Sequence, residues 1–362
     1  MTPSALRVGL IGYGYAGKTF HAPLIAGVPG LVLAAVASRD AARVHADFPA
    51  AEVLADPQTL LRRADLDLVV IASPNDSHFP LARAALAEGR HVVVDKPFTL
   101  TLAEARELGA LARARGRVLA VFHNRRWDGD FLTLRELAER GTLGRIAHLE
   151  SAFDRFRPAV RARWRESAAP GGGLWFDLGP HLLDQALQLF GWPDSIRLDA
   201  ATLRDGGQAD DWFQALLTWP QRRAVLRASM LAAAPAPRFA VHGTGGSWLK
   251  WGLDPQEDAL KAGARPSWPP PPGWGVDANE SRLTRPVGEA LQNEAWPLQR
   301  GCQGAFYAAL RDALRGEGAN PVPPEQAIAV MALIELGQRS AREGRTLEAG
   351  PMPELAELPE KR

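Results

Sequence analysis

Residues 6–17 read LRVGLIGYGYAG, an apolar run that ends in the pattern G-x-G-x-x-G and leads into a helical pattern over 16–26. The glycine pattern alone is weak evidence, but a preceding strand and a following helix are the context of a dinucleotide-binding βαβ unit. In such a unit Gly12 makes the tight turn, Gly14 lets the backbone approach a pyrophosphate, and Gly17 lets the helix pack on the strand. The helix N-terminus adds free N–H groups and positive potential. The predicted cofactor contacts on this turn are Gly12, Tyr13, Gly14, Tyr15, Ala16 and Gly17.

Short apolar runs alternate with helical patterns through the first third of the chain. The apolar runs are 7–11, 31–37, 68–72, 91–94 and 118–122. The helical patterns are 16–26, 57–63, 78–88 and 102–115. Nearly continuous apolar strands separated by amphipathic helices are typical of a parallel sheet that is covered on both faces. The sequence therefore predicts an α/β Rossmann domain over residues 1–124.

The pattern changes after this point, and all eleven tryptophans lie at or after Trp127. Strand-like runs over 146–153, 196–203, 212–219, 223–230, 238–242 and 248–251 follow one another through short turns. Such a series predicts an α+β domain over 125–350 with a large, mostly antiparallel open sheet, followed by a tail over 351–362. Helices over 174–190, 302–314 and 324–342 are predicted to cover one face. Residues 264–300 are predicted to form a long loop, a lid or a packing arm.

Composition excludes several classes of partner. The 42 basic and 41 acidic residues are mixed along the chain, so no strong field recruits nucleic acid or a membrane surface, and we expect a small-molecule partner. The single cysteine, Cys302, excludes an internal disulfide and a multi-cysteine metal site, and we predict no metal. No signal peptide pattern opens the chain, and no apolar run is long enough to span a bilayer. We expect a cytoplasmic protein.

The end of the second strand bears on the choice of cofactor. An NAD site usually carries an acidic residue there for the ribose 2′-hydroxyl, whereas this strand ends in Ser38 and Arg39. A hydroxyl followed by a guanidinium suits a 2′-phosphate, because arginine offers a charge-assisted fork and a plane for stacking. The prediction is NADP. Asp40 leaves NAD open as the alternative.

Transfer of a hydride to or from an alcohol carbon needs a group that takes the hydroxyl proton and a group that stabilises charge on the oxygen. A Tyr-x-x-x-Lys pair is absent, because Tyr13, Tyr15 and Tyr307 are each followed four places on by another residue type. Asp95-Lys96-Pro97 follows the strand over 91–94, at the edge where open α/β sheets bind ligands. Lys96, one of only five lysines, is the first candidate.

The second candidate is a pair on the helix that begins after three glycines at 171–173. Asp177 and His181 are four residues apart and so share one helix face, where a carboxylate can interact with an imidazole. The glycines would let backbone lie close to a ligand. Either residue alone would more often be a cap or a packed side chain; the pair, together with Lys96, favours chemistry.

Four ordered motifs together resemble the Gfo/Idh/MocA oxidoreductase family. They are Gly12–Gly17, Ser73-Pro74-Asn75-Asp76-Ser77-His78, Asp95-Lys96-Pro97 and Gly171–His181, and the resemblance covers nearly the whole chain. It implies a Rossmann domain joined to an α/β domain whose open sheet forms a subunit interface, and so a homodimer or homotetramer. It also implies oxidation or reduction of sugars, inositols and related polyols with NAD(P). Within the family the chain is most similar to the scyllo-inositol dehydrogenase-like subgroup.

The resemblance also implies roles for individual residues. Lys96 would contact the reacting hydroxyl, His181 would accept its proton, and Asp177 would position the substrate or His181. Asp95 stands where the family more often has glutamate, so its contact with the cofactor ribose stays open. Further cofactor contacts implied are Ser73, Pro74, Asn75, His78, Asn124, Trp164 and Arg165. The implied substrate contacts are Lys96, Asn124, Arg126, Asp177 and His181.

Three functions fit these residues. The first is reversible hydride transfer between a nicotinamide and a secondary alcohol of a polyol or sugar. The second is a cofactor-binding sensor without turnover, which would not need Lys96 and His181 as a working pair. The third is a redox-neutral glycosidase or epimerase that oxidises one carbon transiently. Product analysis separates them.

Overall fold

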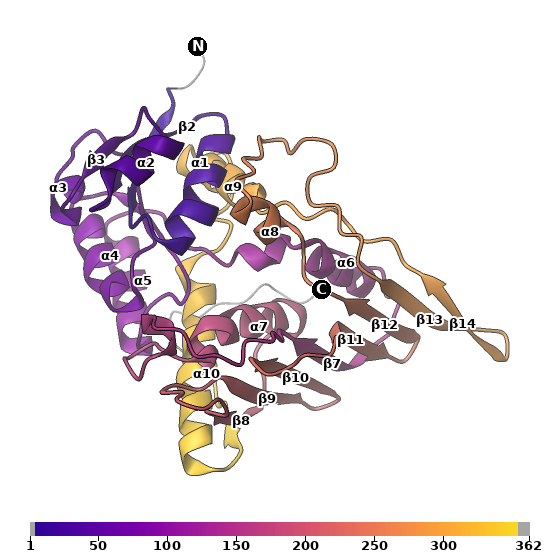
Figure 1. Ribbon diagram of the computed structural model, residues 1–362. Helices are drawn as coiled ribbons and strands as arrows, with labels where there is room; N and C mark the ends of the chain where they lie inside the picture. The colour runs from indigo at the N-terminus through magenta and orange to yellow at the C-terminus, as the bar shows by residue number, and fades with distance from the viewer. Residues whose placement is uncertain (1–3, 354–362) are drawn as a thin grey trace. The chain divides into compact units, whose positions relative to one another are not determined.

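A computed structural model describes residues 4–353, so most of the predicted tail, 354–362, lies outside the described residues. The chain divides into two compact units (Figure 1). The first unit contains the residues up to Trp127, together with Pro255–Gly275 and Cys302–Ala327. The second contains Asp128–Asp254, Val276–Gly301 and the residues from Ile328 onward. The predicted division into 1–124, 125–350 and 351–362 stays a prediction; in these units two later segments return to the first.

The first unit is built on a six-stranded parallel sheet in the order β3-β2-β1-β4-β5-β6. Its strands are β1 (Leu6–Ile11), β2 (Leu31–Ala37), β3 (Glu52–Leu54), β4 (Leu68–Ile71), β5 (His91–Val94) and β6 (Leu119–Val121). The residues of β4 are fully buried, as expected for a sheet covered on both faces. The predicted Rossmann fold is confirmed. Strand β3 was not predicted, because three residues carry too short a pattern.

Helices connect these strands. They are η1 (Gly17–His21), α1 (Ala22–Gly27), α2 (Ala41–Asp47), α3 (Pro57–Leu61), η2 (Asn75–Ser77), α4 (His78–Ala87), α5 (Leu102–Ala114) and η3 (Asn124–Trp127). Helices α8 (Gln256–Lys261) and α9 (Gly304–Leu314) come from the returning segments. The chain moves from β1 to β2 in one direction and from β4 to β5 in the other, so right-handed crossovers place α1 and α4 on opposite faces. The sheet therefore has its switch point between β1 and β4, where open α/β sheets bind ligands.

The second unit is built on a nine-stranded sheet in the order β14-β13-β12-β11-β7-β10-β9-β8-β15. Its strands are β7 (Ile146–Ala152), β8 (Ser195–Ala201), β9 (Trp212–Trp219), β10 (Arg222–Ser229), β11 (Pro237–Gly243), β12 (Gly246–Trp251), β13 (Ser281–Val287), β14 (Ala290–Ala295) and β15 (Leu347–Glu348). Neighbouring described strands pair antiparallel except β7 and β10, which are parallel. The predicted mostly antiparallel sheet is confirmed.

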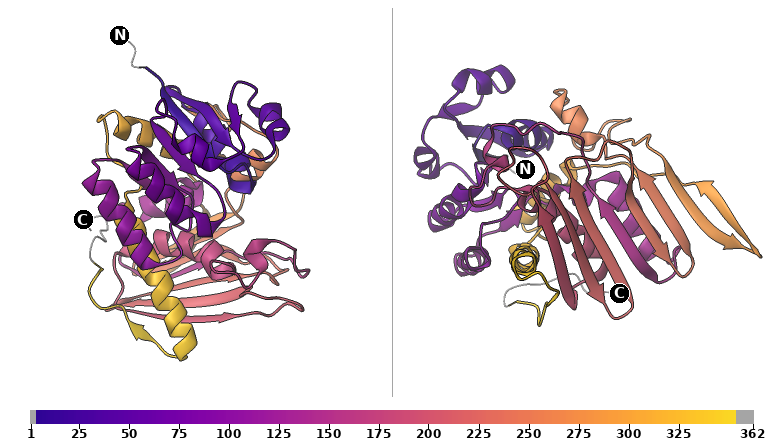
Figure 2. Two further views of the ribbon diagram at one scale, coloured as in Figure 1. Left: turned by 90° about the vertical axis from the view of Figure 1, so that its left-hand side faces the viewer. Right: turned by 60° about the horizontal axis from the view of Figure 1, so that its bottom comes forward.

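Helices of the second unit cover one face of this sheet (Figure 2). They are α6 (Gly129–Glu139), η4 (Trp164–Glu166), α7 (Leu174–Phe190) and most of α10 (Pro324–Glu343). Helix α7 packs on β9 and β10, and the indole of Trp175 donates to the carbonyl of Ile334 on α10 at 3.1 Å. The burial pattern of β9 alternates, so every second side chain faces the side away from α7.

Two predictions about this region are wrong. Helix α9, predicted to cover the large sheet, belongs to the first unit, where it packs against α1. Residues 264–300 are not one long loop, because β13 and β14 form a hairpin within them. Among residues 4–353, no helix has the length and apolar content needed to cross a membrane.

Candidate functional site

The glycine-rich turn begins directly after β1. Gly12 has φ +96°, and a Cβ there would press on the carbonyl of Ala72 after β4. A Cβ on Gly17 would overlap the carbonyl oxygen of Gly12. Around Gly14, by contrast, no heavy atom lies within 4 Å of an added Cβ. The first and third glycines are therefore required by packing, whereas the second leaves open space beside the backbone.

This difference predicts two separable effects of substitution. Gly17→Ala should destabilise the protein by about 2 kcal/mol or more, because backbone on both sides must move. Gly14→Ala should leave the free protein as stable as wild type but weaken dinucleotide binding at least tenfold, since the methyl group would occupy the open space. Thermal unfolding and equilibrium dialysis with NADP measure the two effects. Equal loss of stability in both variants would contradict this account.

The helix after the turn differs from the predicted continuous helix over 16–26. Its first part, η1, is a π-helix in which the N–H of Ala22 donates to the carbonyl of Gly17, and α1 follows. Pro23 has no N–H to give to the helix ladder at this junction. The last residue of η1, His21, is fully buried. π-Turns are frequent at functional sites.

Tyr13 and Tyr15 on the turn are held by acidic residues that sequence reasoning missed. The hydroxyl of Tyr13 donates to Asp47 at 2.8 Å, and burial together with that contact raises the pKa of the phenol. The hydroxyl of Tyr15 donates to Glu257 on α8 at 2.7 Å. Arg125 lies 2.5 Å from Glu257, and its charge holds the pKa of this buried carboxyl well below its usual range. Glu257, in the segment that returns to the first unit, therefore holds the turn through Tyr15.

The three residues after β2 differ in their contacts. Arg39 is exposed, and its side chain forms no hydrogen bond or ion pair with the rest of the described chain. Asp40 instead caps helix α2, accepting the N–H of Arg43 at 3.0 Å. Ser38 accepts the N–H of Asp40 at 3.2 Å. The carboxylate is therefore engaged in capping, and the guanidinium is available to a ligand.

Two further loops meet the turn at the carboxyl ends of β4 and β5. In the first, Ser73 and Ser77 share a hydrogen bond of 2.6 Å. His78 at the start of α4 is buried, and its ring nitrogens lie 3.0 Å from the carbonyl of Ser73 and 2.8 Å from that of Pro97. His78 therefore connects the loop after β4 to the loop that carries Lys96.

Lys96 is partly exposed and follows the buried Asp95 directly after β5. The Asp95 carboxylate lies 3.6 Å from Nε2 of His21. Although burial opposes ionisation, His21, Lys96 and His78 together lower the pKa of this carboxyl below its usual value. A carboxylate that stays ionised therefore lies at the base of the lysine.

Helix η3 after β6 carries the last predicted residues of the first unit. Asn124 is 4% exposed, and its amide makes no hydrogen bond to another described residue. Arg126 is buried and donates to the side chain of Gln326 at 2.6 Å. The structure thus holds Arg126 through Gln326, and a ligand contact of Asn124 stays a prediction.

In the second unit the start of α7 is shaped by glycine. Gly171 and Gly173 have φ +78° and +93°, and a Cβ on Gly173 would overlap the carboxylate of Asp210. That carboxylate accepts the N–H of Trp175 at 2.6 Å. Asp210, which sequence reasoning missed, thus satisfies an N–H in the first turn of the helix that carries Asp177 and His181.

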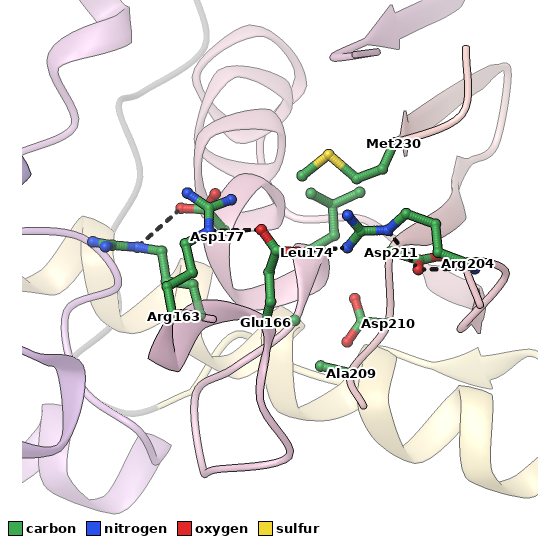
Figure 3. A pocket seen from close by; sticks show the side chains of 11 residues that line it. Arg163, Glu166, Leu174, Asp177, Arg204, Ala209, Asp210, Asp211 and Met230 are labelled. Carbon is green, nitrogen blue, oxygen red and sulfur yellow. Dashed lines mark hydrogen bonds and ion pairs between the residues drawn. The ribbon is translucent and has the colours of Figure 1, made fainter. Parts of the chain in front are cut away.

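A small, open pocket, with room for about one water molecule, lies beside this helix start (Figure 3). Its lining residues are Arg163, Arg165, Glu166, Gly173, Leu174, Asp177, Arg204, Ala209, Asp210, Asp211 and Met230. The arginines are matched by acids: Arg163 lies 2.6 Å from Glu166, and Arg204 lies 3.0 Å from Glu166 and 2.9 Å from Asp211. The wall is therefore polar, and its arginines are ion-paired.

Of the predicted residues of the second unit, Arg165 and Asp177 line this pocket. Asp177 lies 3.7 Å from the guanidinium of Arg165, which in turn lies over the ring of Trp164 at 4.3 Å. The N–H of Gly173 donates to the carbonyl of Arg165 at 2.8 Å, so η4 is tied to the start of α7. His181, one turn further along α7, is 4% exposed. The interaction between Asp177 and His181 stays a prediction.

Asp210 gives stability a pH dependence of unusual sign. Burial raises its pKa from 3.8 to about 6 despite the backbone N–H groups that it accepts. The folded protein therefore binds this proton more tightly than the unfolded chain, and stability falls as pH rises from about 4 to 6. Asp210→Asn should remove the penalty and stabilise the protein by up to about 3 kcal/mol at pH 8, with little effect at pH 4.

Thermal melts of Asp210→Asn across this pH range measure the effect. Asp56→Asn is a matched control, because Asp56 caps α3 but is exposed, and hydrogen bonds from Gln58 and Thr59 lower its pKa. Its substitution should destabilise the protein at neutral pH, the opposite sign. A stability difference between Asp210→Asn and wild type that is the same at pH 4 and pH 8 would be inconsistent with a buried, titrating cap.

Both units match known protein families. Family models described as "Oxidoreductase family, NAD-binding Rossmann fold" and "Oxidoreductase family, C-terminal alpha/beta domain" match residues 6–123 and 135–349. The chain is 58% identical to the uncharacterized oxidoreductase YdgJ of Escherichia coli over 94% of its length and 98% of the relative. It is 34% identical to the scyllo-inositol 2-dehydrogenase (NADP(+)) IolW of Bacillus subtilis, over 94% and 95%. The solved structure of YPO2259 from Yersinia pestis has a TM-score of 0.91 at 53% identity, over 95% and 97%.

Proposed function

Because this chain belongs to the Gfo/Idh/MocA oxidoreductase family and is an NAD(P)-dependent dehydrogenase or reductase, we propose that its substrate is a secondary alcohol of a sugar, inositol or related polyol. The observation that carries the proposal lies within the first unit. There, a partly exposed lysine stands beside an ionised carboxylate, at the same sheet edge as a glycine-rich turn with open space at its second glycine.

The residues present fit a dinucleotide. Open space beside Gly14 suits a pyrophosphate, and Asn124 on η3 would add an amide to the same site. When bound, the nicotinamide would exchange a hydride with the alcohol carbon. The residues proposed to hold the cofactor are the turn 12–17, Ser38, Arg39, Ser73, Pro74, Asn75, His78, Asp95, Lys96, Asn124, Trp164 and Arg165.

The proposed work of the protein is to move a proton and to orient the alcohol. Lys96 would donate a hydrogen bond to the reacting oxygen and stabilise negative charge on it. His181 would take the hydroxyl proton, and Asp177 would position the substrate or the imidazole. Asn124 and Arg126 would contact the substrate. The ion-paired side chains next to Asp177 would suit a neutral polyol better than an anionic substrate.

Two finer proposals accompany this one. NADP is the preferred cofactor, since Arg39 is exposed and uncommitted whereas Asp40 is used as a helix cap; the relative IolW is named for NADP(+). Association into a homodimer or homotetramer would use the uncovered face of the large sheet, where Trp212, Leu216 and Val225 are half-buried. A cytoplasmic location stays a prediction.

Product analysis tests the function. Purified protein is incubated with NADP or NAD and a panel of inositols and sugars, and absorbance at the reduced-nicotinamide band is followed alongside chromatography of the products. We expect net cofactor reduction and a keto product with at least one neutral polyol. No reaction with any compound would favour a sensor. Cleavage or epimerisation with the cofactor returned unchanged would favour redox-neutral chemistry.

A further inference from the structure

Three buried polar side chains form a chain behind Lys96, and the proposed reaction does not use two of them. The hydroxyl of Tyr307 on α9 lies 2.6 Å from Nδ1 of His21, at the end of η1. Nε2 of the same ring lies 3.6 Å from the carboxylate of Asp95. Tyr307 and His21 are fully buried, and Asp95 is 6% exposed. Buried polar groups in such a line have few other partners, so each restricts its neighbour.

The donors and acceptors of this chain can be assigned from its two ends. At 3.6 Å the contact between Nε2 of His21 and Asp95 is electrostatic and longer than a hydrogen bond, and an ionised carboxylate favours a hydrogen on the ring nitrogen that faces it. In the neutral ring Nδ1 is then an acceptor, and the Tyr307 hydroxyl donates to it. Tyr307 keeps its proton, because burial and the charge of Asp95 raise the pKa of its phenol well above the ordinary value. The hydrogens thus run from Tyr307 through His21 toward Asp95.

Aromatic packing fixes the imidazole in this orientation. The ring of Phe122 lies 4.3 Å from that of His21, and Tyr307 meets His21 edge-on at 6.2 Å. Phe306 packs against both Phe122 and Tyr307. The imidazole therefore has little freedom to turn away from Asp95.

We propose that Tyr307, His21 and Asp95 form a positioning network for Lys96. His21 holds the Asp95 carboxylate at the base of the lysine, and Tyr307 sets the tautomer of His21. The network also joins the helix that follows the glycine-rich turn to the strand end that carries the lysine. None of the three needs to touch the substrate. The inference rests on the proposed function, because it assigns a role relative to the group that would contact the alcohol.

The network has a measurable electrostatic consequence. The groups that act on Asp95 are His21 from η1, His78 from α4, Tyr307 from α9 and Lys96 beside it. Removing the His21 N–H leaves a buried carboxylate with less support, so that Asp95 takes up a proton more readily. Loss of that negative charge removes an attraction on the Lys96 ammonium. The Lys96 nitrogen should therefore react faster with an acylating reagent.

Competitive labelling measures this reactivity without substrate or cofactor. The whole protein is treated with trace acetic anhydride at one fixed pH, and the Lys96 peptide is quantified by mass spectrometry. Asp95→Asn should raise the labelling rate of Lys96 several-fold, the effect of losing a neighbouring opposite charge. His21→Leu should raise it by a comparable factor. Tyr307→Phe, which removes only the hydroxyl, should raise it by less.

His91→Leu is the matched control. His91 lies at the opposite end of β5 and accepts the N–H of Val118 at 2.9 Å, so its loss should leave Lys96 unchanged. If His21→Leu does not fold, Tyr307→Phe decides. An unchanged labelling rate of Lys96 in the folded His21 and Tyr307 variants, or an equal rise in His91→Leu, would overturn the network. Since no turnover is measured, the network can fail while Lys96 remains essential for reaction, and the reverse.

Discussion

Lys96→Met is expected to lower kcat/KM for the polyol substrate by roughly 10² to 10⁴, the range typical of a positioned acid or base group. Methionine preserves the length and apolar stem of lysine but cannot donate a hydrogen bond or carry charge. Asp95 behind it would remain held by His21. Most of the loss should appear in kcat, because the proposed contact strengthens as charge develops on the alcohol oxygen. Steady-state kinetics with the best substrate of the panel measure the change.

Two controls make this result specific. NADP affinity, measured by fluorescence titration, should change by less than about threefold, since in this proposal most of the cofactor contacts come from the turn at 12–17 and from Arg39. Lys261→Met removes a different lysine of the first unit, one that is ion-paired with Glu257 and Asp258, and should keep full activity. If Lys96→Met turned over at the wild-type rate, the proposed role of this lysine would be wrong.

Arg39→Asp is expected to weaken NADP binding by about 100-fold or more. The substitution removes a charge-assisted contact and places a negative charge beside the 2′-phosphate, and such contacts contribute about 1.5–3 kcal/mol each. The free protein should lose no stability, because the exposed side chain of Arg39 has no partner elsewhere in the described chain. NAD binding should be unchanged or improved, so the ratio of the two Kd values, measured by calorimetry, reports the switch.

Arg83→Asp is the matched charge reversal. Arg83 is an exposed arginine of the same unit that pairs with Glu107 across α4 and α5. Its reversal changes the net charge equally but should leave the preference between NADP and NAD intact. Equal weakening of NADP binding in both variants would mean that Arg39 acts through general charge alone. Unchanged NADP binding in Arg39→Asp would rule out the 2′-phosphate contact.

Long, strongly patterned elements of the fold could be predicted from sequence. Strands β1, β2, β4 and β5 and helix α7 are found where periodicity placed them, because burial on both faces leaves an uninterrupted apolar run. Helix α2 was missed, since it has seven residues and buries only Val44. The hairpin of β13 and β14 was missed because most of its side chains are exposed on both faces, so no alternation marks it.

Helix α9 shows a different limit. Its amphipathic pattern predicted a helix at nearly the correct position, but nothing in the pattern states which sheet the apolar face covers. The chain crosses between the units at 127, 254, 275, 301 and 327. Long-range packing decides each crossing, so no local sequence pattern marks where the chain returns to the first unit.

Some residues of the candidate site could also be predicted from sequence, and others could not. Motifs with local spacing, such as the turn 12–17 and Asp95-Lys96, could be located from sequence because their chemistry depends on neighbours in the chain. Asp210, Glu257 and Tyr307 could not, because each becomes informative only through a partner more than thirty residues away. His21 lay inside a recognised helix pattern, but only the π-turn and the contact with Asp95 distinguish it.

Transfer of deuterium is the most direct test of the proposed chemistry. A polyol that reacts in the panel is prepared with deuterium on its reacting carbon. After a single turnover, the reduced cofactor is isolated and its mass is measured by mass spectrometry. We predict that the reduced NADP carries one deuterium atom and that the polyol becomes a ketone. A reduced cofactor without deuterium, or a consumed polyol with an unchanged cofactor, would contradict direct hydride transfer from the alcohol carbon to the nicotinamide.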